Sequence, residues 1–163
     1  MQVRGLRQDE ATRLRELRLR ALADAGQELG PFLEEEREFP PSYWQAIADD
    51  TEVGHRRVCF VAGEGDGLVG MVGADWDAQA RRVDLVALWV DPARRGEGIG
   101  AALVEAVVGW AAEHRADRVE LWVVDEASHA AALYSACGFV ESGVRQTVPY
   151  SPQQMEKLLI RRL

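Results

Sequence analysis

The segment from Leu88 to Ala101, with the sequence LWVDPARRGEGIGA, places two arginines and three closely spaced glycines ahead of a helical pattern. Backbone N–H groups at the start of a helix are unpaired and carry partial positive charge. Gly96, Gly98 and Gly100 would let an anion approach those groups without a Cβ in the way. Arg95 adds a charged donor. The pattern predicts a phosphate-binding turn, the alternative being glycines that serve only close packing.

Two kinds of phosphate-bearing ligand compete for this turn. Gly96, Gly98 and Ala101 match the G-x-G-x-x-G/A fingerprint of dinucleotide-binding folds. Such a fold adds several βα units after its glycine turn, whereas only residues 102–163 follow here. The acidic residue expected roughly 20 residues further on would be Asp117, which precedes the next strand instead of ending it. A nicotinamide enzyme is therefore the weaker hypothesis.

Composition excludes some partners. The 163 residues carry a formal net charge of −8, with 47% hydrophobic and 28% charged residues, as one globular domain would. An acidic chain is a poor nucleic-acid binder. Cys59 and Cys137 lie in apolar runs without metal-like spacing, and no apolar run is long enough to cross a membrane. We expect one cytoplasmic domain over residues 1–163, with no metal, nucleic-acid partner or membrane association.

Apolar periodicity predicts the elements that position the turn. VDLVALWV, residues 83–90, is almost continuously apolar, which is typical of a strand inside a sheet. A helix is expected over about residues 98–114 because apolar residues recur there at three- and four-residue steps. Further strands are expected at 118–124, 144–148 and 155–161. The order of elements predicts a mixed α/β domain.

The N-terminal part has weaker signals. Asp9 is expected to cap a helix that ends at Gly26. Residues 27–41 are expected to be irregular. Ser42 and Gln45 form a capping box for a short second helix.

The turn Arg95-Gly96-Glu97-Gly98-Ile99-Gly100 resembles the Q/R-x-x-G-x-G/A motif of GNAT-type N-acetyltransferases, which binds the pyrophosphate of acetyl-coenzyme A. Downstream, AAALYSACGF is similar to the second signature of that family. The two signatures form a specific pair, and the resemblance covers nearly the whole chain. It implies a single-domain α/β fold with a mixed, mostly antiparallel sheet. Its central parallel strands would splay around the acetyl-coenzyme A site, flanked by about four helices.

The resemblance also implies which residues bind the coenzyme, largely through main-chain groups. Strand 83–90 would meet the pantetheine arm and the turn would meet the pyrophosphate. Family members often have asparagine seven residues before the tyrosine of the second signature, where this chain has Ala127. The implied coenzyme-binding residues are Leu88, Trp89, Val90, Arg95, Gly96, Glu97, Gly98, Ile99, Gly100 and Ala101, with Ser128 as a replacement for the missing asparagine.

Tyr134 matches the tyrosine that the family places near the coenzyme sulfur. A phenol stays protonated at neutral pH, so it can donate a proton to the departing thiolate. The alternative is a tyrosine that packs on its helix with the hydroxyl in solvent.

An amine acceptor must lose a proton before it attacks, which requires a base. Asp84 is the leading candidate, because apolar surroundings raise the pKa of a carboxyl group. On an alternating strand it would share a face with Val86, Leu88 and Val90. Asp84 paired with Arg82, Glu120 as the base, and a water chain remain alternatives.

The acceptor is the least constrained part of the prediction. Residues 27–41 occupy the place of the family's substrate-lining loop, and aromatic and acidic groups suit a cationic amine. The candidate substrate-binding residues are Phe32, Glu35 and Trp76, with Tyr150 also bordering the cleft.

The predicted activity is transfer of acetyl from acetyl-coenzyme A to a primary amine of a small molecule or peptide, by direct attack in a ternary complex. The alternative is a catalytically silent acyl-coenzyme A-binding module that regulates a partner. Homodimers are common in the family, so a homodimer is possible here.

Overall fold

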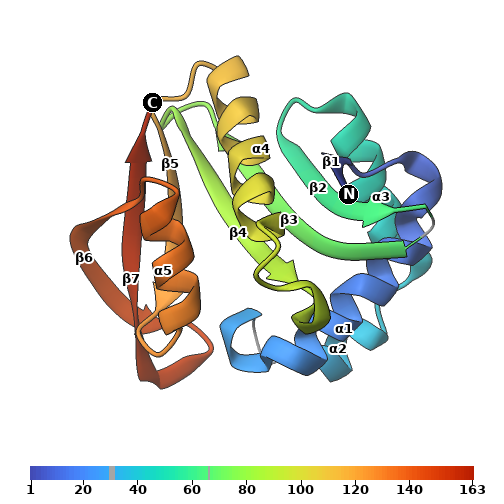
Figure 1. The fold of residues 1–163 in the computed structure, drawn as a ribbon, viewed down its shortest axis with the longest axis horizontal. Helices are drawn as coiled ribbons and strands as arrows, with labels where there is room; N and C mark the ends of the chain where they lie inside the picture. The colour runs from blue at the N-terminus through green and yellow to red at the C-terminus, as the bar shows by residue number, and fades with distance from the viewer. Residues whose placement is uncertain (30–31, 66) are drawn as a thin grey trace.

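One seven-stranded sheet, in the order β1-β2-β3-β4-β5-β7-β6, forms the centre of the computed structural model (Figure 1). The structure describes residues 1–29, 32–65 and 67–163, without the side chains of residues 26–29 and 128. The strands are β1 (Gln2–Gly5), β2 (Arg57–Glu64), β3 (Gly67–Asp77), β4 (Arg82–Val90), β5 (Arg118–Val124), β6 (Val140–Val148) and β7 (Ser151–Arg162).

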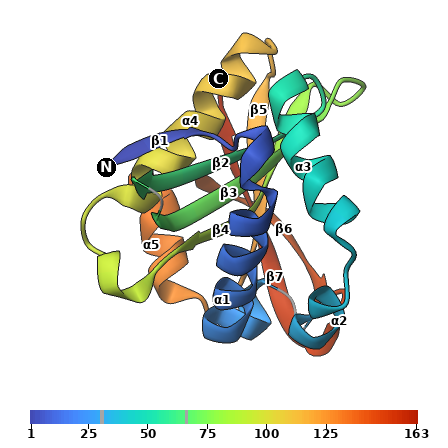
Figure 2. The ribbon, with the colours of Figure 1, turned by 90° about the vertical axis from the view of Figure 1, so that its right-hand side faces the viewer.

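Helices cover both faces of this sheet. α4 and α5 lie on one face, and α1 and α3 lie on the other (Figure 2). Within the described ranges, no helix has the length and apolar sequence that a membrane span needs. The helices are α1 (Ala11–Leu29), α2 (Leu33–Arg37), α3 (Pro41–Val53), α4 (Ile99–Glu113) and α5 (Ser128–Ala136), with 3-10 turns η1 (Gln8–Glu10) and η2 (Pro92–Arg94).

Each face has its own hydrophobic core, as period-two strands and amphipathic helices require. On the first face, Val83 and Leu85 of β4 pack with Leu103 and Val107 of α4. On the opposite face, the second core gathers residues of α1, α3, β2, β3 and β4: Leu14, Leu17, Trp44, Val61, Met71 and Trp89. β4 therefore contributes to both cores from the middle of the sheet, as its apolar sequence predicts.

The predicted fold class is confirmed, including the parallel central strands. Parallel pairing joins Arg82–Asp84 of β4 to Arg118–Glu120 of β5, and beyond these residues the two strands diverge (Figure 1). The other five strand pairings are antiparallel. A dinucleotide-binding fold is built on an open, mostly parallel sheet, so the nicotinamide hypothesis does not fit this topology.

β4 carries an extra residue that changes which side chains share a face. Met71 of β3 pairs with Trp89 of β4, and Gly73 of β3 pairs with Val86 of β4. Two residues of β3 therefore lie opposite three residues of β4. Ala87 adopts φ +55°, which is unusual for a residue with a Cβ. This β-bulge reverses the alternation of side chains beyond it.

Four N-terminal predictions are wrong in detail. Residues 27–41, which were expected to be irregular, include the end of α1, the whole of α2 and the first residue of α3, and an ion pair between Arg18 and Glu36 holds α2 against α1. α1 runs through Gly26 to Leu29, because its buried leucines stabilise it by more than the roughly 1 kcal/mol that a helical glycine costs. Asp9 lies inside η1 and does not cap α1. α3 begins with Pro41 at its first position, before the predicted Ser42 cap, since proline already has the φ that a helix start needs.

Candidate functional site

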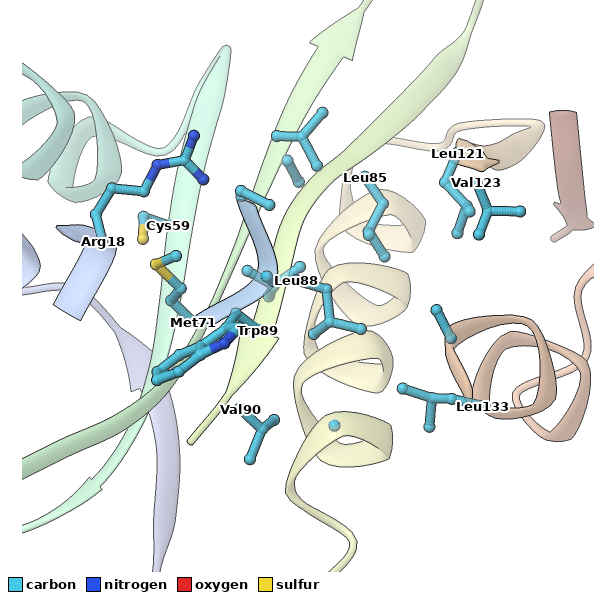
Figure 3. A pocket seen from close by; sticks show the side chains of 18 of the residues that line it. Arg18, Cys59, Met71, Leu85, Leu88, Trp89, Val90, Leu121, Val123 and Leu133 are labelled. Atoms are coloured by element: carbon cyan, nitrogen blue, oxygen red, sulfur yellow. The ribbon is translucent and has the colours of Figure 1, made fainter. Parts of the chain in front are cut away.

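A cleft of about 1370 Å³ opens where β4 and β5 diverge. Leu88 of β4, Leu121 and Val123 of β5, and Leu133 of α5 point toward this opening, while Trp89 lies on the other side of β4 beside Met71 (Figure 3). The cleft is lined from both faces of the sheet. We call the side with the turn before α4 the coenzyme end, and the side beneath α1, α2 and α3 the acceptor end.

At the coenzyme end, the three glycines of the turn have two different physical roles. Gly96 and Gly98 have φ of +84° and +80°, which L side chains rarely adopt, and a Cβ on either would meet no heavy atom within 4 Å. Both residues are exposed, and neither has a side chain to cover its backbone groups at the start of α4. Gly100 packs closely against α5, because a Cβ there would lie 3.0 Å from Leu133 Cδ2, which would have to shift. The turn thus contains both the exposed amides and the close packing that its sequence predicts.

These features fit a diphosphate. A helix start with uncovered amides attracts an anion. The cleft is lined by most of the predicted coenzyme residues: Leu88, Trp89, Val90, Arg95, Gly96, Gly98, Ile99, Gly100 and Ala101. Glu97 does not line it, and its carboxylate pairs with Arg94 Nε at 2.9 Å. The side chain of Ser128 lies outside the described part of the chain.

Arg95 is held by α1. Its Nη2 donates to Asp24 Oδ2 at 2.6 Å, and its Nε donates to the carbonyl oxygen of Val90 at 3.0 Å. Asp24 also accepts from Trp89 Nε1 at 2.8 Å. The hydrogen bond from Trp89, followed by that from Arg95, lowers the pKa of Asp24 despite the opposing effect of burial. The Asp24 carboxylate therefore connects α1 to the turn that contains Arg95.

Tyr134 lines the cleft between its two ends. It is 7% exposed, and its ring packs edge-on against Phe139 with centroids 5.8 Å apart. α5 positions it, although Ala127 at the helix N-cap provides no side-chain hydrogen bond, as a methyl group cannot. The Tyr134 ring is therefore buried, and the residue lines the cleft.

Asp84 belongs to a row of carboxylates at the acceptor end. It pairs across the sheet with Asp75 on one side and Glu120 on the other, and all three line the cleft. Burial raises the pKa of Asp84, Arg82 opposes that shift, and the charges of Glu120 and Asp75 add to it. The expected direction of this pKa shift is confirmed.

Two details of the Asp84 prediction need correction. The bulge at Ala87 leaves Asp84 and Val86 on the acceptor side, and it moves Leu88 and Val90 to the face that packs against α4. Asp84 also accepts a hydrogen bond from Arg82 Nε at 3.1 Å, which was the alternative reading of this residue. The carboxylate is thus both ion-paired and open to the cleft, with 38% of its side chain exposed.

The predicted acceptor residues are not brought together. Trp76 points to the α4 face, where its ring lies 5.6 Å from that of His114, so it does not border the cleft. Glu35 is exposed outside the cleft lining. Phe32 does not line the cleft either, but its ring packs edge-on, at 5.6 Å, against Tyr150, which does. This contact joins the residues before α2 to the turn between β6 and β7.

Sequence reasoning missed several side chains of the acceptor end. Glu36, next to the predicted Glu35, lines the cleft and is held by Arg18 through two hydrogen bonds of 2.9 Å. Trp122 shares the face of Glu120 because it is two residues further along β5, a signal that the period of two already contained. Glu156 of β7 also lines the cleft, and no local pattern indicated it. In the described chain, no three His, Cys, Asp or Glu residues form a metal-binding group.

Splayed parallel strands, a glycine turn at a helix start and a tyrosine between them define the class of acyl-coenzyme A-dependent transferase folds. Residues 16–139 match the family described as Acetyltransferase (GNAT) family. The chain belongs to this family, as the two signatures predicted.

The relatives agree with this assignment. An uncharacterized N-acetyltransferase of Methanocaldococcus jannaschii is 37% identical over 92 residues, which is 53% of this chain and 39% of the relative, less than two thirds of its length. A solved nourseothricin acetyltransferase is 26% identical with a TM-score of 0.61, covering 66% of this chain and 65% of that one. The PaiA N-acetyltransferase of Thermoplasma acidophilum, in complex with coenzyme A, has a TM-score of 0.80 at 14% identity, covering 99% and 98% of the two chains.

Proposed function

We propose that this protein transfers an acetyl group from acetyl-coenzyme A to a primary amine of a small molecule or peptide, by direct attack in a ternary complex. The observation that carries the proposal is a single cleft that joins the uncovered amides of Gly96 and Gly98 to Tyr134 and Asp84. Family membership and the coenzyme-bound relative support the choice of acetyl-coenzyme A over other anions.

The coenzyme would supply the activated acetyl thioester, and the chain would supply binding and proton transfer. Amides from Gly96 to Ala101 would hold the diphosphate. Asp84, whose pKa is raised, would accept the proton of the incoming ammonium group, directly or through water, and Glu120 is the alternative base. The Tyr134 hydroxyl would donate a proton to the departing sulfur. Both side chains line the same cleft, as such a proton relay requires.

Release of free coenzyme A thiol, measured with a panel of amines, amino acids, aminoglycosides and peptides, tests the activity. We expect acceptor-dependent release, and we expect Tyr134→Phe to lower kcat by about 10²–10³-fold, the usual contribution of a general acid. The coenzyme Kd, measured by calorimetry, should not change, because the substitution removes one hydroxyl and leaves the amides intact. Coenzyme binding without turnover of any acceptor, together with no effect of Tyr134→Phe, would instead favour the silent binding module.

A further inference from the structure

Glu156 differs from every other buried glutamate among the described residues. Four glutamates are buried, with exposures of 1% for Glu10, 7% for Glu36, 7% for Glu120 and 7% for Glu156. The first three each pair with an arginine: Glu10 with Arg4 at 2.7 Å, Glu36 with Arg18 at 2.9 Å and Glu120 with Arg118 at 2.5 Å. Within the described part of the chain, Glu156 has no cationic partner, and its carboxylate accepts one hydrogen bond, from Gln146 Nε2 at 2.6 Å.

A buried carboxylate of this kind is unfavourable unless a cation neutralises it. Removing an ion from water costs several kcal/mol, and a neutral amide donor compensates for only part of that. The chain supplies an arginine to the other three glutamates, so the exception at Glu156 indicates that its cation comes from elsewhere. Glu156 lines the cleft, which gives a ligand direct access to it.

The surroundings of Glu156 suit an ammonium group. Tyr150 lines the same cleft as Glu156, and its pKa is raised first by burial and then by the charge of Glu156. Phe32 packs edge-on against Tyr150. A carboxylate beside an aromatic ring is a common receptor for a cationic amine.

Strand register gives the distance from this site to the proposed base. Glu156 pairs with Val124 of β5, whereas Ile160 pairs with Glu120, in the row that contains Asp84. Four residues of strand correspond to about 13 Å, at about 3.3 Å per residue. Asp84 and Glu156 are also two strands apart, which adds about 10 Å across the sheet, so an acceptor whose reacting amine lies near Asp84 would reach Glu156 with a second group on the order of 15 Å away.

We propose that Glu156 binds a second cationic group of the acceptor, so that the protein selects diamines and other dicationic amines over monoamines. This inference rests on the proposed acetyl transfer and adds to it the substrate class and the residue that recognises it.

Steady-state kinetics with two matched series test the inference: α,ω-diaminoalkanes of four to twelve carbons, and n-alkylamines of the same lengths. We expect kcat/KM to favour the diamines, with an optimum length among them. In Glu156→Gln the ratio of diamine to monoamine kcat/KM should fall about 10–100-fold, mainly through KM, because truncating a buried charge contact costs that much. Glu141→Gln, which changes an exposed glutamate paired with Lys157 on the same hairpin, should keep the wild-type ratio.

Thermal unfolding separates recognition from a structural role. Glu156→Gln should keep or raise Tm, because it removes an unneutralised charge and leaves a side chain that can still bond Gln146. A lower Tm with equal losses on both amine series would overturn the inference, as would wild-type kinetics without any preference for diamines. If neither series is acetylated, calorimetry with diamines in the presence of coenzyme A decides. Diamine binding that Glu156→Gln weakens tenfold would support the Glu156 site although acetyl transfer has failed. No diamine binding would refute both the Glu156 site and the proposed acetyl transfer.

Discussion

At the coenzyme end of the cleft, the candidate binding groups are backbone amides from one continuous segment, residues 95–101, whereas at the acceptor end they are side chains from several separate elements. The first end contains two glycines at positive φ with no heavy atom near their Cβ positions. The second contains charged side chains that include Arg18 of α1, Glu36 of α2, Asp75 of β3, Asp84 of β4, Glu120 of β5 and Glu156 of β7.

This difference has a physical consequence. A backbone site is insensitive to side-chain chemistry but sensitive to an added Cβ, since the Cβ changes the conformation and covers the amides. A side-chain site is sensitive to an isosteric change of charge, while its backbone tolerates substitution. If the proposed function holds, we expect the coenzyme end to suit one invariant ligand and the placement of charges at the acceptor end to set specificity.

Asp84→Asn is the isosteric change with the largest expected effect at the acceptor end. If Asp84 is the base, kcat should fall by about 10²-fold at neutral pH. The wild-type rate should fall as the pH drops through the raised pKa of Asp84, because the carboxylate becomes protonated, and the variant should lack this acidic limb. The pH dependence of kcat checks both points. Asp75→Asn should keep the limb but move it to lower pH, since Asp75 contributes to the raised pKa.

Asp84→Asn should lower kcat but raise the stability of the folded protein. A raised carboxyl pKa means that the folded protein binds a proton more tightly than the unfolded chain, so ionised Asp84 destabilises the fold above that pKa. The variant should therefore unfold at a slightly higher Tm at neutral pH. An unchanged pH profile, or a lower Tm with equal loss of rate at every pH, would argue that Asp84 is only the partner of Arg82.

Gly98→Val tests the coenzyme end without changing the charge of the protein. Because φ is +80° at Gly98, a side chain should strain the backbone by roughly 1–2 kcal/mol. Covering one amide should also weaken coenzyme A binding roughly 10–100-fold, because one hydrogen bond to a charged group contributes about 1.5–3 kcal/mol. Calorimetry measures the Kd.

Gly65→Val is a matched control for that substitution. Gly65 also has a positive φ, +56°, and a Cβ there would meet nothing within 4 Å, but it lies after β2 and does not line the cleft. Both variants should therefore lower Tm, while only Gly98→Val changes the coenzyme Kd. Equal Kd values for the two variants would show that uncovered amides at Gly98 do not bind the coenzyme.

The same contrast explains how much could be predicted from sequence. The coenzyme end was predictable because its glycines, Arg95 and the following helix are neighbours in the chain, and the apolar runs predicted the strands that frame it. The acceptor end was not, since Glu36 and Glu156 meet the cleft only through tertiary structure. Glu35 was chosen in place of Glu36 because α2, a five-residue helix held by the Arg18–Glu36 ion pair, has no local signal.

The bulge in β4 was the other unpredictable feature. Ala87 adopts a positive φ without the glycine that would have indicated it, so simple alternation put Asp84 on the same face as Leu88. Opposite this region, Gly73 of β3 packs closely against Val86, since a Cβ at Gly73 would lie 3.0 Å from Val86 Cγ2. This contact is non-local, and the periodicity of either strand does not contain it.

Asp24→Asn should have the smallest effect, and it tests whether the two ends of the cleft are coupled. α1 carries Arg18 at the acceptor end and Asp24 at the coenzyme end, where Asp24 holds both Trp89 and Arg95. Removing the charge frees the Arg95 guanidinium to pair with a phosphate, so coenzyme affinity should rise about two- to fivefold, as partly exposed ion pairs contribute about 1 kcal/mol or less. The gain should shrink at high salt.

Asp24→Asn should weaken acceptor binding while it strengthens coenzyme binding. Losing the contacts of Asp24 loosens α1, and with it the Arg18–Glu36 pair, so KM for the acceptor should increase modestly while the coenzyme Kd decreases. A double-mutant cycle with Arg95→Ala separates the two effects, because Asp24→Asn should no longer improve coenzyme binding when Arg95 is absent. Weaker coenzyme binding in Asp24→Asn alone would mean the reverse: Asp24 positions Arg95 for the diphosphate instead of competing with it.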